Sequence, residues 1–327
     1  MKLATYQDGS RDGQLIVVSR DLSQAHYASH IANRLQQVLD DWNFLSPQLQ
    51  DLSDALNAGK ARHAFAFDPR NCMAPLPRAY QCVSANAYAS AQNLLPDAGE
   101  PALACDPRRE RSMVQVASDF LLGACDPMVC VSETLGLDFG GGVAVVTGDL
   151  PAGCSPERAL EGVRLVMLLN EARLQTLGSI VACAFSPVAV TPDELGDAWA
   201  KGKLNLPLQC SWNGRKVGLC DAGSGMQSSF GRLLANLCET RDIRAGSIIA
   251  TGPVGSKGEE RKGRTEWPQG YCCIADKRAM ETLQDGQPST DYLRFGDSIR
   301  LEMKRPDGGS VFGAIEQDVA AVATAQR

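Results

Sequence analysis

Short apolar runs separated by turn residues open this chain. Lys2–Tyr6 and Leu15–Ser19 are two such runs, and the pairs Asp8-Gly9 and Asp12-Gly13 lie between them. Gly after Asp favours the tight turns that join antiparallel strands. The pattern therefore predicts a hairpin within the first 20 residues.

Two helices are expected next. From Ser23 to Trp42 apolar residues recur at helical spacing, with Ser23 as a possible N-cap. Ser46-Pro47 then begins a second helical stretch, which Gly59 ends. We interpret residues 1–70 as a small α+β unit and the Pro- and Arg-rich residues 71–84 as a linker.

The remaining residues, 85–327, form a larger unit in which strand signals outnumber helix signals. Strands are expected at 143–147, 188–190, around 212–217 and at 247–251, and a hairpin is expected around Asp307-Gly308-Gly309. Helices are expected over 155–173 and 230–240. Many strands with few long helices favour an α+β fold over a doubly wound sheet.

Composition narrows the function classes. The 327 residues carry a formal net charge of −6, which argues against nucleic acid or an anionic membrane as the main partner. No apolar stretch approaches the ~20 residues needed to cross a bilayer, and the first residues lack the apolar core of a secretory signal. We therefore expect a cytoplasmic protein whose 12 cysteines are thiols, either buried fillers or reactive groups.

Four segments carry a resemblance to a known family: residues 31–49, 137–148, 184–196 and 294–316. Together they resemble the fumarylacetoacetate hydrolase family over nearly the whole chain. The resemblance implies a mixed β-sandwich or β-roll domain after a small N-terminal domain, and a homodimer. It also implies a small-molecule ligand.

Members of this family typically bind Mg²⁺, Mn²⁺ or Ca²⁺ and cleave a carbon–carbon bond in a β-diketo acid or acylpyruvate. Hard cations take oxygen ligands, so carboxylates must converge on one face. A Glu-x-Glu pair in a strand meets this need because alternate side chains share a face.

The sequence departs from the family at these positions. Gly140-Gly141-Gly142 stands where the resemblance implies Glu-Ala-Glu, and Glu171 stands where it implies an aspartate ligand. Glycine offers only its backbone carbonyl, so two anionic ligands are lost. Further positions of the family pattern are occupied by Ala91, Val114, Ile180 and Pro253.

The candidate residues follow from this comparison. No metal site is expected; Glu171 is a remnant, and a divalent metal (Mg, Mn or Ca) would be the cofactor only if that remnant still binds one. The catalytic candidates are Glu133, Glu171, Cys183 and Cys272. The substrate-binding candidates are Tyr88, Asp138, Gly140, Gly141, Gly142, Gly252 and Pro253.

Three functions stay open. We favour a repurposed enzyme that acts on a small oxo-acid-like or enolic metabolite without a metal. The alternative is a catalytically inactive homologue that binds a metabolite or a partner subunit. Conventional Mg²⁺-dependent hydrolysis fits the substitutions least well.

Overall fold

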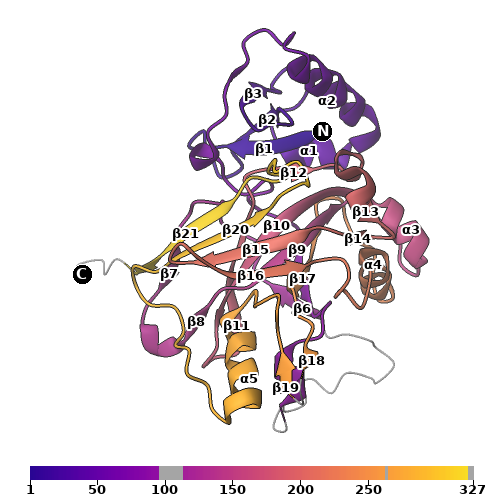
Figure 1. The fold of residues 1–327 in the computed structure, drawn as a ribbon. Helices are drawn as coiled ribbons and strands as arrows, with labels where there is room; N and C mark the ends of the chain where they lie inside the picture. The colour runs from indigo at the N-terminus through magenta and orange to yellow at the C-terminus, as the bar shows by residue number, and fades with distance from the viewer. Residues whose placement is uncertain (96–112, 262–263, 323–327) are drawn as a thin grey trace, which may run out of the picture.

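The computed structural model describes residues 1–95, 113–261 and 264–322 (Figure 1). A 12-stranded sheet and a 5-stranded sheet form most of it, with a few helices at their margins. The fold is therefore α+β, as predicted. None of the helices within these ranges is long and apolar enough to cross a bilayer.

The large sheet runs through both the N-terminal residues and the rest of the chain. Its order is β4-β3-β2-β1-β12-β10-β9-β17-β5-β6, with β8 and β11 paired to β10. Its strands are β1 (Lys2–Tyr6), β2 (Gln14–Val18), β3 (Gln24–Tyr27), β4 (Phe65–Ala66), β5 (Cys82–Ala85), β6 (Met113–Val116), β8 (Leu137–Asp138), β9 (Gly141–Thr147), β10 (Val163–Leu174), β11 (Ser179–Phe185), β12 (Ala189–Val190) and β17 (Ile248–Pro253).

The second sheet has the order β16-β15-β20-β21-β7. Its strands are β7 (Met128–Cys130), β15 (Pro207–Trp212), β16 (Arg215–Asp221), β20 (Ser298–Met303) and β21 (Ile315–Ala321). Two small hairpins add β13 (Trp199–Ala200) with β14 (Lys203–Leu204), and β18 (Glu259–Arg261) with β19 (Arg264–Glu266).

The helices lie at the margins of the sheets (Figure 1). The α-helices are α1 (Leu35–Asp40), α2 (Trp42–Asn57), α3 (Pro156–Glu161), α4 (Phe230–Cys238) and α5 (Ile274–Asp285). Four 3₁₀ segments complete the set: η1 (Pro69–Asn71), η2 (Ala91–Leu94), η3 (Glu133–Leu135) and η4 (Pro192–Ala198).

The helix predicted over 155–173 is wrong beyond Glu161. After α3 the chain forms β10, a 12-residue strand whose residues are almost all buried. β10 pairs with β8, β9, β11 and β12, so it lies in the middle of the sheet. A strand that is covered on both faces is apolar throughout, so its sequence does not alternate and resembles a buried helix.

The helix predicted from Ser23 to Trp42 is also wrong in its first half. Gln24–Tyr27 is strand β3, in which Ala25 pairs with Val18 of β2. Only Leu35–Asp40 is helical before α2 begins. Pairing with the preceding strand thus overrides a weak local helical pattern.

The strand over 143–147, helix α4 and the strand at 298–303 are confirmed. The last hairpin is also present, although its second strand starts at Ile315 instead of Ser310. Helix α5 had no counterpart in the predictions, and it forms one wall of the site described below.

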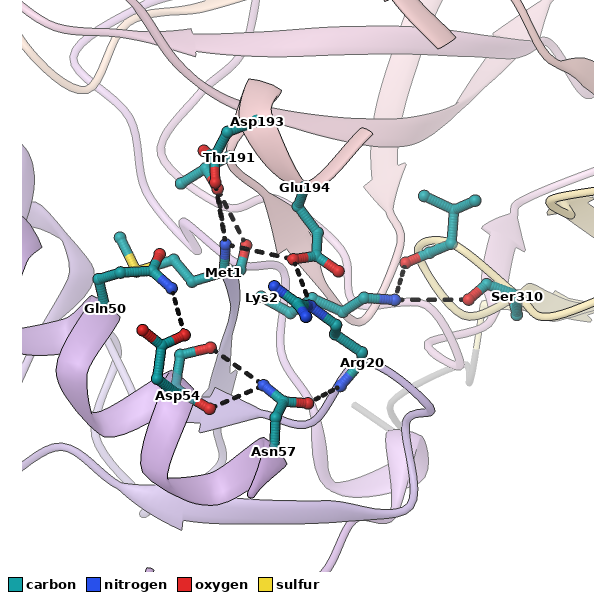
Figure 2. A network of polar contacts seen from close by, with 12 residues as sticks. Met1, Lys2, Arg20, Gln50, Asp54, Asn57, Thr191, Asp193, Glu194 and Ser310 are labelled. Atoms are coloured by element: carbon teal, nitrogen blue, oxygen red, sulfur yellow. Dashed lines mark hydrogen bonds and ion pairs between the residues drawn. The ribbon is translucent and has the colours of Figure 1, made fainter. Parts of the chain in front are cut away.

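Polar contacts fasten the first strands to the larger unit (Figure 2). Lys2 is 0% exposed, and its Nζ donates to the carbonyl of Val311 at 2.6 Å and to that of Ser310 at 3.4 Å. Arg20 Nε lies 3.1 Å from Glu194 Oε2. Burial, with a smaller effect of the charge on Arg305, lowers the pKa of Lys2 to about 8.

Because Lys2 is buried, we expect the free energy of unfolding to change with pH in the alkaline range. Between pH 8 and 10.5 the folded state binds fewer protons at Lys2 than the unfolded state does. Stability relative to a Lys2→Met variant should therefore rise across this window, by about 3 kcal/mol. Urea unfolding of both proteins at several pH values measures the difference, and a constant difference would contradict the prediction.

Candidate functional site

Gly140 precedes β9 and Gly141 and Gly142 begin it, and added Cβ atoms at these three positions would point in alternating directions. A Cβ on Gly141 would face the core, 3.1 Å from Leu208 Cδ2 and 3.2 Å from Cys210 Sγ. A Cβ on Gly140 would instead lie 2.9 Å from Pro253 Cγ and 3.3 Å from Glu171 Cβ. Gly140 and Gly142 therefore share the face opposite to the core, as strand geometry requires.

The space in front of these two glycines is already filled. A Cβ on Gly142 would overlap the carbonyl oxygen of Gly252 and lie 3.1 Å from Thr251 Oγ1. Gly252 has φ +73°, a backbone conformation that favours glycine, and it brings its carbonyl into this position. The ring of Pro253 covers Gly140. The predicted residues Gly140, Gly142, Gly252 and Pro253 thus meet, but they pack against one another.

The carbonyls of this stretch are engaged as well. Gly140 O accepts from Glu171 N at 2.9 Å, and Gly141 O accepts from Val254 N at 2.8 Å. Gly141 N donates to Cys272 O at 2.8 Å. These backbone groups of the stretch therefore already have hydrogen-bond partners within the protein.

Glu171 lies fully buried on β10. Its Oε1 accepts a hydrogen bond from the Ser84 hydroxyl, and its Oε2 lies 2.9 Å from Arg173 Nη2. Glu171 and Arg173 are two residues apart on one strand, which places both side chains on the same face. The positive guanidinium compensates the buried carboxylate, which would otherwise be costly to desolvate.

A polar cavity of about 110 Å³ lies beside this pair. It is bounded by residues 86–93, by Asp138 and Pro253, by Arg173 and Gln175, and by the start of α5. Typical sites for drug-sized ligands occupy roughly 300 Å³ or more, so this cavity has room only for a very small molecule. Tyr88 lines it and donates from its hydroxyl to Ala222 O at 2.8 Å, and burial raises its pKa.

Asp138 connects the cavity to helix α5. Its Oδ1 accepts from Ile274 N at 2.7 Å, and its Oδ2 accepts from Ala275 N at 2.9 Å and from Gln175 Nε2 at 3.0 Å. The N-cap residue, Cys273, makes no side-chain cap of its own. Asp138 therefore caps a helix that is distant in sequence. Burial raises its pKa to about 7, although the three hydrogen bonds oppose this change.

A second carboxyl group, Asp276, lies in the first turn of α5 and lines the same cavity. Its Oδ1 accepts hydrogen bonds from the Ser90 hydroxyl and from Gln92 Nε2, the latter at 3.0 Å. Burial raises its pKa as well. Two carboxyl groups with raised pKa values in one cavity form the type of arrangement that serves acid–base chemistry.

The cysteine and glutamate candidates lie elsewhere. Cys183 is buried on β11 against Cys82, and Cys272 is buried against Cys210 and Cys220. The pKa of each thiol is raised, chiefly through its contact with Cys82 or Cys210, so each stays protonated and is a poor nucleophile. Glu133 is exposed, and its Oε1 accepts from Phe295 N at 2.8 Å.

The sequence predictions did not include Ser90, Gln92, Arg173, Gln175 and Asp276. Arg173 could not be linked to Glu171 from the sequence, because residues 155–173 were predicted to form a helix, and side chains two positions apart share a face only in a strand. Asp276 gave no signal either, since α5 itself was not predicted.

Two family models match this chain almost end to end. The model described as the fumarylacetoacetase N-terminal domain 2 matches residues 1–78, and the model of the fumarylacetoacetate (FAA) hydrolase C-terminal domain matches residues 81–320. The chain therefore belongs to the fumarylacetoacetate hydrolase family. A comparison with curated proteins gives no match.

Solved structures of the same fold cover nearly the full length of both chains. Maleylpyruvate hydrolase from Sphingobium sp. SYK-6, in complex with manganese(II) and pyruvate, is 14% identical with a TM-score of 0.65, and 98% of this chain and 99% of that chain are covered. Fumarylacetoacetate hydrolase from Exiguobacterium antarcticum is 19% identical with a TM-score of 0.63 and the same coverage. The 2-hydroxyhepta-2,4-diene-1,7-dioate isomerase from Mycobacterium marinum is 13% identical with a TM-score of 0.57, covering 99% and 100%. At these identities the likeness concerns the fold.

The residues of this chain do not fit the divalent metal that the family implies. Gly140 and Gly142 supply no carboxylate, and both oxygens of Glu171 already have partners. Across the parts of the chain that the structure describes, no three His, Cys, Asp or Glu side chains are placed to hold a metal ion. A hard cation needs several oxygen ligands of adequate charge.

Proposed function

We propose that this chain binds a small oxo acid or its enol in the polar cavity and acts on it without a divalent metal. The observation that carries the proposal is the filled space at Gly140 and Gly142, where Gly252 and Pro253 exclude any metal-binding side chain. The cavity beside it is lined by a cation, Arg173, and by two carboxyl groups, Asp138 and Asp276. These groups support the proposal of a site for a small polar molecule that does not depend on a metal.

The reaction that suits these groups is proton transfer between the keto and enol forms of the bound acid. It removes a proton from the carbon beside the carbonyl and adds one to the oxygen, so no co-reactant is needed. A positioned carboxyl group can act as the acid–base group. Both oxygens of Asp138 are occupied by the start of α5 and by Gln175, so we assign this role to Asp276.

The test is deuterium exchange into the methyl group of pyruvate, followed by proton NMR in D₂O with EDTA present. We expect exchange above the buffer rate with the wild-type protein, and a loss of roughly 100-fold or more in an Asp276→Asn variant. Addition of Mg²⁺ or Mn²⁺ should leave the rate unchanged. Glu133→Gln, which alters a carboxylate outside the cavity, is the matched control.

Three other results would each count against the proposal. Acylpyruvate cleavage that rises with Mg²⁺ and vanishes in EDTA would support the conventional hydrolase. Pyruvate binding without exchange would support an inactive, metabolite-binding homologue. Equal exchange in the wild-type and Asp276→Asn proteins would remove the role of that carboxyl group. The homodimer implied by the family stays a prediction.

A further inference from the structure

We propose that Arg173 is the resident cation of the cavity and directly binds the carboxylate of the ligand. The inference rests on the proposed function, because it concerns the same cavity. It names Arg173 as the residue that selects an anionic ligand, and a carboxylate as the chemical group that this residue binds.

The guanidinium of Arg173 is only partly used by the protein. Its Nη2 contacts Glu171 at 2.9 Å, whereas its Nε is buried and has no hydrogen-bond partner in the described part of the chain. The side chain is 34% exposed and lines the cavity. A buried carboxylate therefore holds the guanidinium at Nη2, and the exposed part of the side chain borders the cavity.

A carboxylate is the group that best completes this arrangement. Guanidinium donors match the two oxygens of a carboxylate in planar geometry, and such charge-assisted bonds are stronger than neutral ones. Because the Nε atom is buried, the exposed remainder of the side chain is the part that a ligand oxygen in the cavity can reach. The side chains of Gln92 and Asn93 line the same cavity and offer further amide groups to a small polar ligand.

If the only role of Arg173 were to compensate the charge of Glu171, its side chain would not need to border a cavity. Arg164, on the same strand, provides the comparison: its Nε is also buried without a partner in the described residues. The guanidinium carbon Cζ of Arg164 instead lies 5.7 Å from the centroid of the Trp42 ring, and Arg164 does not line this cavity. The combination of a buried carboxylate, an open guanidinium face and a small polar cavity occurs at Arg173 and not at Arg164.

The test measures binding of pyruvate in EDTA by isothermal titration calorimetry, with oxalate and acetate as further probes. Arg173→Met alone would leave Glu171 buried without its cation, so it is combined with Glu171→Gln, which keeps an acceptor for Ser84. This double variant should weaken pyruvate binding at least ~10-fold while remaining folded, as judged by circular dichroism and thermal melting. Arg173→Lys keeps the positive charge but lacks the paired N–H donors of a guanidinium. Its affinity for pyruvate should therefore lie between those of the wild-type protein and the double variant.

Arg164→Gln is the control on the same strand and should bind pyruvate as the wild-type protein does. If the folded double variant binds as tightly as the wild type, the role of Arg173 is overturned, whereas the proposed function stands. If the wild-type protein binds none of the three carboxylates, both fail. If Arg164→Gln weakens binding as strongly as the double variant, the effect is one of general charge and the specific role of Arg173 is overturned.

Discussion

A Gly142→Ala substitution is expected to lower the free energy of unfolding by about 3 kcal/mol. The new Cβ would overlap the carbonyl oxygen of Gly252 and crowd Thr251 Oγ1 at 3.1 Å. Backbone cannot move aside as a flexible side chain does, so β9 and β17 would have to separate locally. Urea unfolding of the wild-type and variant proteins measures the change.

Gly225→Ala is the matched control. A Cβ there would meet its nearest heavy atom at 3.6 Å, an ordinary contact, so we expect a change of at most about 1 kcal/mol. Equal stability of the two variants would show that Gly252 leaves room in front of Gly142. The main argument against a metal site in this chain would then fail.

The prediction also bears on attempts to restore the family pattern. A Gly140→Glu/Gly142→Glu double variant places two carboxylates on the correct face of the strand, yet Pro253 and Gly252 occupy the space they need. We expect loss of folding and no gain of Mn²⁺ binding. Replacement of the loop that contains Gly252 and Pro253 would be needed first.

Asp138→Ala is expected to destabilise the protein by about 3 kcal/mol as well. Three donors lose their acceptor at once: the amides of Ile274 and Ala275 and the side chain of Gln175. Each buried donor left unsatisfied costs roughly 1 kcal/mol or more, and an alanine in place of a helix cap has a cost of similar size. Hydrogen exchange should become faster at Ile274 and Ala275 in particular.

Asp242→Ala tests whether this effect is specific. Asp242 also caps a backbone amide, that of Ala152 at 2.8 Å, but at an exposed site and with a single bond. A loss of at most about 1 kcal/mol is expected there. If Asp138→Ala costs no more than Asp242→Ala, then α5 is held in place by its apolar contacts alone, and Asp138 does not organise the cavity wall.

The sequence predicted those elements whose patterns are local. The strand that becomes β9 is a β-branched run bounded by glycines, and α4 carries apolar residues at helical spacing within one stretch. The hairpin near Asp307-Gly308-Gly309 follows from its turn residues. These features need no knowledge of the rest of the chain.

The two segments whose predicted structure is wrong are those in which pairing with another strand decides the conformation. β10 has an apolar sequence that suits a buried helix or a central strand equally, and its neighbours on both sides make it a strand. Gln24–Tyr27 becomes β3 because β2 offers it an open edge. In both cases hydrogen bonds to a neighbouring strand outweigh the conformational preference of the segment itself.

The same division holds for the site. The sequence by itself determined the family and showed that Gly140-Gly141-Gly142 and Glu171 replace the expected ligands. Only the tertiary structure decided that Gly252 and Pro253 fill the space above those glycines, that Arg173 compensates Glu171, and that Asp138 and Asp276 meet at the start of α5. Which side chains replace a lost ligand depends on the close approach of β9, β10, β17 and α5, and that approach is set by packing, not by any pattern along the chain.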